Sequence, residues 1–183
     1  MCQHWEREFT RVRNWIAEQE DHLDELDCCK LVVPTILSSS KSVEARLSIL
    51  ERWKREAQVL ICTYDLYRSC VFSGDARFYE YLVNPGPDVI ALDEGHKIKH
   101  MNSQISKALS GVAAKKRIIM TGYPLQNNLR EYYSMINFAL PGLLGSPLEF
   151  KLKYEKPISK VHMVSATSCT PAQKKQARRR AWM

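Results

Sequence analysis

A pair of carboxylates directly follows a short apolar run in the middle of the sequence. The run is Val89–Leu92, and the residues after it read Asp93-Glu94-Gly95-His96. At the end of a strand, an Asp can hold the magnesium ion of a nucleoside triphosphate, and a Glu can orient or deprotonate the attacking water. An acidic pair that caps the start of a helix would give the same letters, so this pattern alone leaves both interpretations open.

A second polar segment follows another apolar run further along the chain. The run is Ile118-Ile119-Met120, and the segment after it reads Thr121-Gly122-Tyr123-Pro124-Leu125-Gln126-Asn127-Asn128. Its turn-forming, amide and hydroxyl side chains precede a helical pattern, and a plain N-capped turn would have the same composition. The two segments in this order are much more specific than either one alone.

Short apolar runs alternate with helical patterns along the whole chain. The predicted strands are residues 31–37, 59–63, 89–92 and 118–120, and the predicted helices are residues 1–30, 43–53, a stretch ending near 82, 103–109 and 129–140. This alternation predicts an α/β fold with a parallel sheet and flanking helices. Continuous apolar runs are typical of strands buried on both faces, and ligands bind beyond the carboxyl ends of such strands. From residue 141 onward the composition predicts loops.

The two polar segments resemble motifs II and III of the Swi/Snf family of helicase-like chromatin-remodelling ATPases, and the resemblance is closest to the ATRX branch of that family. It also rests on residues 84–88, 93–99, 117–131, Asn137-Phe138 and 144–150. Asn14-Trp15 is similar to the Asn-Trp that follows motif Ia, and Thr63-Tyr64-Asp65 is similar to the motif Ib region. Tyr123 stands where most of the family has Thr, which we interpret as a subfamily variant.

Members of this family are double-stranded DNA translocases with two RecA-like lobes. The resemblance therefore implies ATP and Mg²⁺ as cofactors, and double-stranded DNA or chromatin as the partner. It implies that Asp93 holds the magnesium ion, that Glu94 positions the hydrolytic water, and that His96 couples the nucleotide site to motif III. Three residues of motif III would link nucleotide state to DNA contact: Thr121, Gln126 and Asn127.

The chain is expected to be an incomplete RecA-like helicase lobe. The pattern G-x-x-x-x-G-K-[ST], which gives a phosphate loop its backbone cradle and lysine, does not occur in the sequence. The resemblance places that loop upstream of Asn14-Trp15 and the second lobe beyond residue 183. We expect residues 1–157 to form part of the first lobe, and residues 158–183 to be a basic tail, the start of the interlobe region or a disordered segment. The chain alone is expected to be inactive, and its partners would include the missing phosphate-loop segment and second lobe.

Charge is distributed unevenly along the chain. Residues 1–95 carry 11 Lys+Arg and 17 Asp+Glu, whereas residues 96–183 carry 16 and 3. The second half is therefore a candidate for contacting phosphates without reading bases. The candidate DNA-binding residues are Lys97, Lys99, Lys116 and Arg117, although a solvated rim would explain the same charges. The basic run from Lys174 to Arg180 resembles a nuclear import signal and predicts a location in the nucleus, with a basic helix as the alternative.

Composition excludes several other classes. The chain has ordinary globular composition, with 45% apolar and 26% charged residues, and no apolar run approaches the roughly 18–20 residues of a membrane span. Six cysteines without a C-x-x-C pair are predicted to be reduced thiols. A zinc site at His96 and His100 is disfavoured because no third ligand has fitting spacing. Three tryptophans at helical spacing are predicted to be packing residues: Trp5, Trp15 and Trp53.

Two functions from different classes remain open. One is a fragment of an ATP-dependent double-stranded DNA translocase, or chromatin remodeller, that couples ATP hydrolysis to movement on DNA. The other is a catalytically inactive truncated module that binds nucleic acid with its basic half or a protein with an exposed sheet edge. An RNA helicase is disfavoured, because the two motifs resemble those of the DNA translocases more closely. A phosphate loop upstream in the same reading frame would favour the first function.

Overall fold

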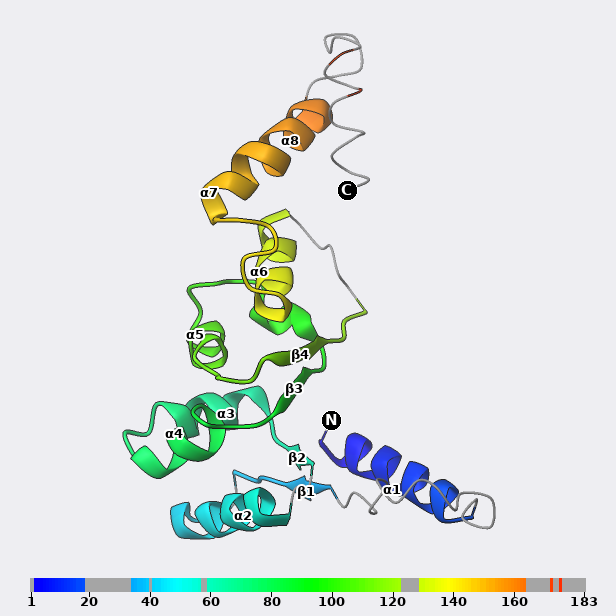
Figure 1. Cartoon of the computed structure of the whole chain (residues 1–183), viewed down its shortest axis with the longest axis vertical. Helices are drawn as coiled ribbons and strands as arrows, with labels where there is room; N and C mark the ends of the chain where they lie inside the picture. Colours follow the sequence, from blue (N-terminus) through cyan, green and yellow to red (C-terminus); the bar gives the residue numbers. More distant parts are fainter. Residues whose placement is uncertain are drawn as a thin grey trace. The chain divides into compact units, whose positions relative to one another are not determined.

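Along the chain, helices alternate with short strands that pair in parallel (Figure 1). The structure is a computed structural model that describes residues 2–18, 34–39, 41–56, 59–122, 129–163, 172 and 175. It divides into two compact units. Unit 1 consists of Met1–Pro87 with Gly111–Ala113, and unit 2 consists of Asp88–Ser110 with Ala114–Met183. Within the described part of the chain, no helix has the length and apolar character that a membrane crossing requires.

Unit 1 contains four helices and one pair of strands among its described residues. Its elements are α1 (Cys2–Glu18), β1 (Thr35–Ile36), α2 (Val43–Glu56), β2 (Leu60–Ile61), α3 (Tyr64–Val71) and α4 (Ala76–Leu82). The strands are parallel, with Thr35 opposite Leu60 and Ile36 opposite Ile61. Thr63 caps α3, because its hydroxyl accepts a hydrogen bond from the backbone N–H of Leu66 (3.3 Å).

The core of unit 1 comes from the apolar faces of its helices. Leu47 and Leu50 lie three residues apart on α2, which places both on one face of that helix. Helices α3 and α4 add Leu66, Tyr67, Cys70, Phe78 and Leu82. The segment Gly111–Ala113 returns to this unit late in the chain, where the N–H of Ala113 donates to the carbonyl of Val83 (2.8 Å) and Val112 is buried.

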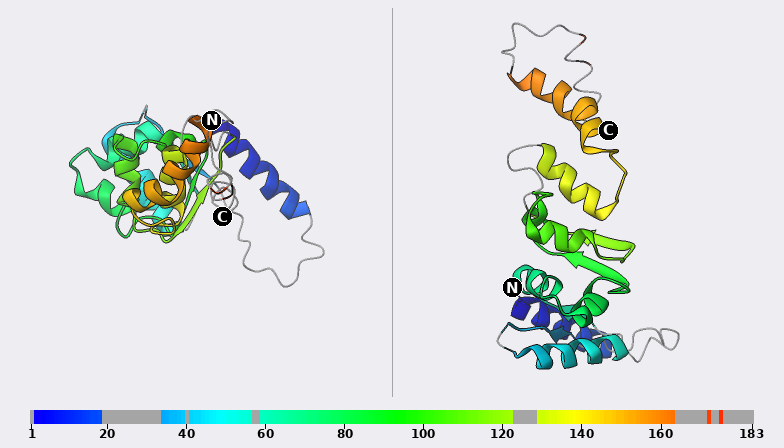
Figure 2. Two further views of the ribbon diagram at one scale, coloured as in Figure 1. Left: turned by 90° about the horizontal axis from the view of Figure 1, so that it is seen from above. Right: turned by 90° about the vertical axis from the view of Figure 1, so that its left-hand side faces the viewer.

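Unit 2 contains the second strand pair. Its elements are β3 (Val89–Leu92), the 3₁₀ turn η2 (Gly95–Ile98), α5 (Gln104–Ser110), β4 (Lys116–Ile119), α6 (Leu129–Ala139), α7 (Pro147–Phe150), the π-helical turn η3 (Lys151–Glu155) and α8 (Lys156–Met163). Strands β3 and β4 are parallel, with Val89 opposite Lys116 and Leu92 opposite Ile119. Figure 2 shows this pairing from a second direction. A tight turn cannot join parallel strands, and η2 and α5 lie in the crossover between them.

The predicted burial of the strands on both faces is wrong. Val89 is 49% exposed and Ile118 is 51% exposed, and Leu92 is the buried residue of β3. The strands themselves lie close to where the apolar runs predicted them. Among the described residues, however, each sheet has two strands, so few neighbours cover the apolar side chains.

The helix predictions were confirmed at α4, α5 and α6. The predicted end of α4 and both predicted ends of α5 and α6 lie within one residue of the observed ends. The predicted loops after residue 141 are wrong in part, because α7, η3 and α8 are helical from Pro147 to Met163. Helix α1 ends at Glu18, and residues 19–33, which complete the predicted first helix and begin the predicted first strand, lie outside the described residues. Trp15 is 61% exposed, so its prediction as a packing residue is also wrong.

Candidate functional site

The pairing of β3 with β4 holds the two motif segments together. Leu92 and Ile119 are partners in the ladder, so Asp93 and Met120 both leave the sheet at its carboxyl edge. The N–H of Met120 donates to the carbonyl of Leu92 (2.8 Å), and the N–H of Gly95 donates to the carbonyl of Met120 (2.8 Å). The turn after β3 is thereby fastened to the residue that precedes Thr121.

The two carboxylates occupy a sharp turn. Glu94 has a left-handed backbone (φ 52°, ψ 52°), which is uncommon outside glycine and concentrates at functional sites. Its N–H donates to Oδ1 of Asp93 (2.9 Å), and its carbonyl accepts from the N–H of Lys97 (3.0 Å) to begin η2. Both carboxylates remain partly exposed. A single residue therefore converts the strand into a helical turn and leaves two carboxylates accessible beside each other.

Gly95 is required by the close approach of β4. A Cβ atom at this position would overlap Cγ2 of Ile119, and it would lie 3.5 Å from the carbonyl oxygen of Met120. Gly95 is itself buried. The glycine of the Asp-Glu-Gly-His segment thus allows the motif II turn to pack directly on the strand that leads into motif III.

His96 lies next to Glu94. Its Nδ1 is 3.1 Å from Oε2 of Glu94. Both atoms are buried, and neither forms an aligned hydrogen bond with a described residue. Buried polar atoms nearly always have a partner, and each of these two atoms has the other within hydrogen-bonding distance. The imidazole is placed to restrict the position of the Glu94 carboxylate.

The donor set at this turn suits a magnesium ion that is shared with phosphate groups. Carboxylate oxygens are hard ligands, and Mg²⁺ in nucleotide sites takes one or two of them together with phosphate oxygens and water. Among the described residues, no three His, Cys, Asp or Glu side chains are grouped to hold a metal ion by themselves. The residues therefore fit an ion that arrives with a nucleotide.

Part of motif III cannot be placed. Thr121 and Gly122 are described, and residues 123–128 lie outside the described residues. The predictions for Gln126 and Asn127, and the variant residue Tyr123, belong to that stretch and stay predictions. Helix α6 begins at Leu129, directly after it.

An ion pair that the sequence analysis missed joins η2 to α6. Nζ of Lys99, at the end of η2, lies 3.7 Å from Oε1 of Glu131 on α6. Glu131 is buried, although a carboxylate is rarely buried unless it is paired. The signal available in the sequence was a charge at a position of α6 that should face the core. Lys99, predicted as a DNA-binding residue, has this intramolecular partner.

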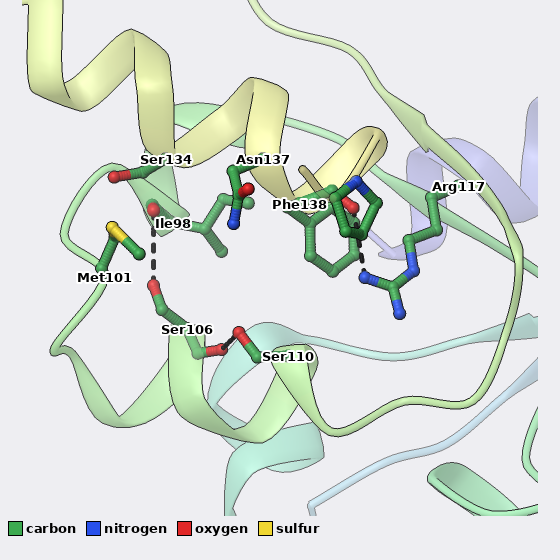
Figure 3. A pocket seen from close by; sticks show the side chains of 9 residues that line it. Ile98, Met101, Ser106, Ser110, Arg117, Ser134, Asn137 and Phe138 are labelled. Atoms are coloured by element: carbon green, nitrogen blue, oxygen red, sulfur yellow. Dashed lines mark hydrogen bonds between the residues drawn. The ribbon is translucent and has the colours of Figure 1, made fainter. Parts of the chain in front are cut away.

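Arg117 is also engaged within the protein. Its Nε donates to the carbonyl of Ala114 (2.8 Å), its Nη1 donates to the carbonyl of Phe138 (3.1 Å), and its Cζ lies 5.0 Å from the centre of the Phe138 ring. Figure 3 shows the guanidinium beside that ring. Lys97 and Lys116 are exposed. The DNA contacts assigned to these basic residues stay predictions.

Figure 3 draws a cavity of about 160 Å³ in unit 2. Ser106 Oγ donates to the carbonyl of Ile98 (3.3 Å), and Ser110 Oγ donates to the carbonyl of Ser106 (2.7 Å). Ser134 Oγ donates to the carbonyl of Arg130 (3.0 Å). The hydroxyl groups on its wall are therefore already bonded to the backbone. The remaining lining residues are Met101, Arg117, Asn137, Phe138 and Pro141, so the acidic pair does not lie on this cavity.

The parallel strand pair, with an acidic turn after one strand and a Thr-Gly turn after the other, has the architecture of a RecA-like lobe. A family model described as the SNF2-related domain matches residues 2–181. The chain therefore belongs to the SNF2-related family of helicase-like chromatin remodellers. The fold agrees with a solved structure, "Sulfolobus solfataricus SWI2/SNF2 ATPase core in complex with dsDNA", with a TM-score of 0.51 and 22% identity over 90% of this chain and 30% of that one.

The sequence relatives include the branch that the motifs suggested. The chain is 35% identical over 161 residues to the human transcriptional regulator ATRX. This alignment covers 84% of this chain and 6% of the relative. It is 35% identical over 175 residues to the Caenorhabditis elegans ATRX homolog, an alignment that covers 85% of this chain and 12% of that relative. It is 30% identical over 198 residues to the helicase ARIP4 of Xenopus tropicalis, with 85% of this chain and 14% of that relative covered. The chain thus spans a small part of the length of these relatives.

Proposed function

We propose that this chain is part of the first RecA-like lobe of an ATP-dependent double-stranded DNA translocase that acts in chromatin remodelling. The observation that carries the proposal is the strand pairing that fastens the Asp93-Glu94 turn to the segment leading into Thr121. The ATRX relatives and the DNA-bound SWI2/SNF2 core support it.

The roles of the acidic turn follow from its chemistry. A bound MgATP supplies the phosphoanhydride bond that is hydrolysed. Asp93 would bind the magnesium ion, and Glu94 would orient the attacking water. His96, 3.1 Å from the Glu94 carboxylate, would hold that carboxylate in position. The left-handed turn at Glu94 would present both carboxylates to the nucleotide on the same side of the sheet edge.

The coupling between nucleotide and DNA is assigned to motif III. Gln126 and Asn127 would respond to the nucleotide and contact DNA, together with Thr121. The exposed Lys97 and Lys116 would meet backbone phosphates without selecting a sequence. Together with the relatives' role as transcriptional regulators, the basic run after Lys174 supports a location in the nucleus.

A second candidate function is a binding module without catalysis. The observation that favours it is the absence of a phosphate-loop pattern from a sequence whose second half is strongly basic. Such a module would use the same lysines on nucleic acid and would not hydrolyse ATP.

The test uses a longer form of the protein that contains a phosphate loop. Glu94→Gln should retain ATP binding and lower the turnover number by several powers of ten, because the carboxylate acts mainly in the transition state. Glu80→Gln, at an exposed position on α4, is the matched control and should leave turnover unchanged. An unchanged turnover number in Glu94→Gln would remove Glu94 from this role. If the longer protein binds DNA without any ATP turnover, the second function replaces the first.

A further inference from the structure

The helix that begins at Pro147 is fixed to unit 2 along one side. Phe150 is buried, and its ring centre lies 4.9 Å from that of Tyr133 on α6 and 5.3 Å from that of Tyr154. Arg130 Nε, also on α6, donates to Oε2 of Glu155 (3.1 Å). The side that carries Phe150 and Tyr154 is therefore the packed side of this helix.

The opposite side carries two leucines that face solvent. Leu148 is 64% exposed and Leu152 is 51% exposed. They are four residues apart, as neighbours on one side of a helix are, and each lies two residues from the buried Phe150. In Figure 1, α7 and α8 continue as one helix. Apolar anchors at this spacing are the feature by which an amphipathic helix packs on an apolar surface of a partner.

The segment that carries the leucines is basic, because residues 147–163 contain four lysines and two glutamates. Glu149 accepts a hydrogen bond from the N–H of Ser146 (2.7 Å), and Glu155 is paired with Arg130. Both carboxylates of the segment therefore have intramolecular partners. Among the described residues, Lys151 and Lys156 form no ion pair. Lys156 follows Leu152 by four residues and extends the row of leucines.

This combination selects one kind of partner. A duplex DNA would satisfy the lysines but would leave the leucines in water. A second copy of this helix would bring like charges together. An amphipathic helix with apolar residues on one face and acidic residues beside them would satisfy both features at once.

We propose that the exposed side of α7–η3–α8, defined by Leu148, Lys151, Leu152 and Lys156, binds an acidic amphipathic helix of a partner protein. The apolar residues of the partner pack on Leu148 and Leu152, and its carboxylates lie against Lys151 and Lys156. The inference does not depend on ATP hydrolysis by the chain.

The test measures the binding of fluorescent peptides to the chain of 183 residues by anisotropy. One probe is a synthetic helical peptide with leucines at positions i, i+4 and i+7 and flanking glutamates, and the other has lysine in place of every glutamate. The acidic peptide should bind, and the basic one should not. Leu148→Ser with Leu152→Ser should raise the dissociation constant at least about tenfold. The matched control is Leu143→Ser, at a leucine that is 61% exposed outside this helix, and it should change the constant less than about twofold.

Charge reversal gives a second test that does not alter the apolar surface. Lys151→Glu with Lys156→Glu should weaken binding of the acidic peptide and strengthen binding of the basic peptide. Lys107→Glu, on α5, should change neither binding constant. Circular dichroism of each variant checks that the helix content is retained. The proposal is overturned if the acidic peptide does not bind, if Leu143→Ser weakens it equally, or if charge reversal has no effect. The surface binds nucleic acid instead if duplex DNA displaces the peptide and if the leucine variants bind duplex DNA as the unmodified chain does.

Discussion

Lys99 and Glu131 connect the turn after motif II to the helix after motif III, with Nζ of the lysine 3.7 Å from Oε1 of the glutamate. Glu131 is buried, so the carboxylate depends on partners inside the protein. Two segments that the chain separates by a strand and a helix are tied by charge as well as by backbone pairing.

Removing the lysine should destabilise the fold. Lys99→Met withdraws an ion pair from a buried carboxylate, and we expect the free energy of unfolding to fall by about 1–3 kcal/mol in urea titrations. The exposed Lys97→Met is the control and should change it by less than about 0.5 kcal/mol. The double variant Lys99→Met with Glu131→Leu should recover most of the loss. Equal effects at positions 97 and 99 would show that the pair contributes nothing.

Gly95 should not tolerate a side chain. In Gly95→Ala the new methyl group meets Ile119, and the overpacking should cost about 1–3 kcal/mol of unfolding free energy. Gly122→Ala is the matched control, because no atom of a described residue beyond its chain neighbours lies within 4 Å of a Cβ built there. Shortening the neighbour in Gly95→Ala with Ile119→Ala should make the two effects less than additive. A Gly95→Ala protein as stable as the parent would contradict the close approach of the turn and β4.

Motif III should separate ATP binding from stimulation by DNA. In the longer protein, Gln126→Ala with Asn127→Ala should leave ATP affinity nearly intact and reduce the increase in turnover caused by duplex DNA. Basal and DNA-stimulated turnover are measured side by side. A parallel fall in both rates would assign these residues to catalysis rather than coupling.

The chain of 183 residues should bind DNA without hydrolysing ATP. Its second half can reach about three to five phosphates, which predicts weak binding with a log-log salt slope near roughly −3 to −4. Titrations of two unrelated duplexes at several salt concentrations, with an ATPase assay alongside, measure both properties. A salt-independent or strongly sequence-selective affinity would refute the electrostatic account, and ATP turnover would show that the site does not need a phosphate loop from elsewhere.

The start of α7 should depend on pH. The N–H of Ser146 donates to Glu149, and together with the Ser146 side chain and nearby Lys153 it holds the pKa of the Glu149 carboxyl below its usual value. A lowered pKa in the folded state stabilises the fold above the pKa of the unfolded chain, and this stabilisation is lost as the pH falls through the folded value. The difference in stability between the parent chain and Glu149→Gln should therefore be present at pH 6 and shrink toward pH 3. A difference that is constant over this range would contradict the cap.

The sequence was sufficient to locate the strands and the helices α5 and α6, because apolar runs and three-to-four spacing are local properties. It was not sufficient to predict burial. Whether Val89 or Ile118 is covered depends on which other elements pack against the strands, and this is not a local property of the sequence. The helix from Pro147 was missed although Ser146 and Glu149 form a capping box and Pro147 occupies the first turn of the helix. These signals depend on the order of the residues, which composition does not report.

The site was predictable to a similar degree. The acidic turn follows directly from the letters after β3, and the pairing with β4 confirms that both motifs leave one edge of the sheet. The left-handed backbone at Glu94 and the contact of Gly95 with Ile119 arise from how closely two strands pack, which no spacing in the sequence reports. The partner of Lys99 was not predictable either, because it comes from a helix that only the fold brings near.

The return of Gly111–Ala113 to unit 1 affects the order in which the chain can fold during synthesis. Unit 1 is not complete when Pro87 has been synthesised, because the hydrogen bond from Ala113 to Val83 and the buried Val112 come later. By then β3 has been made, and its partner β4 begins at Lys116. Both units are therefore completed almost together, and β3 stays an unpaired apolar strand until that moment. At about 5–20 residues per second this interval lasts on the order of a few seconds, during which the unpaired strand is exposed to aggregation.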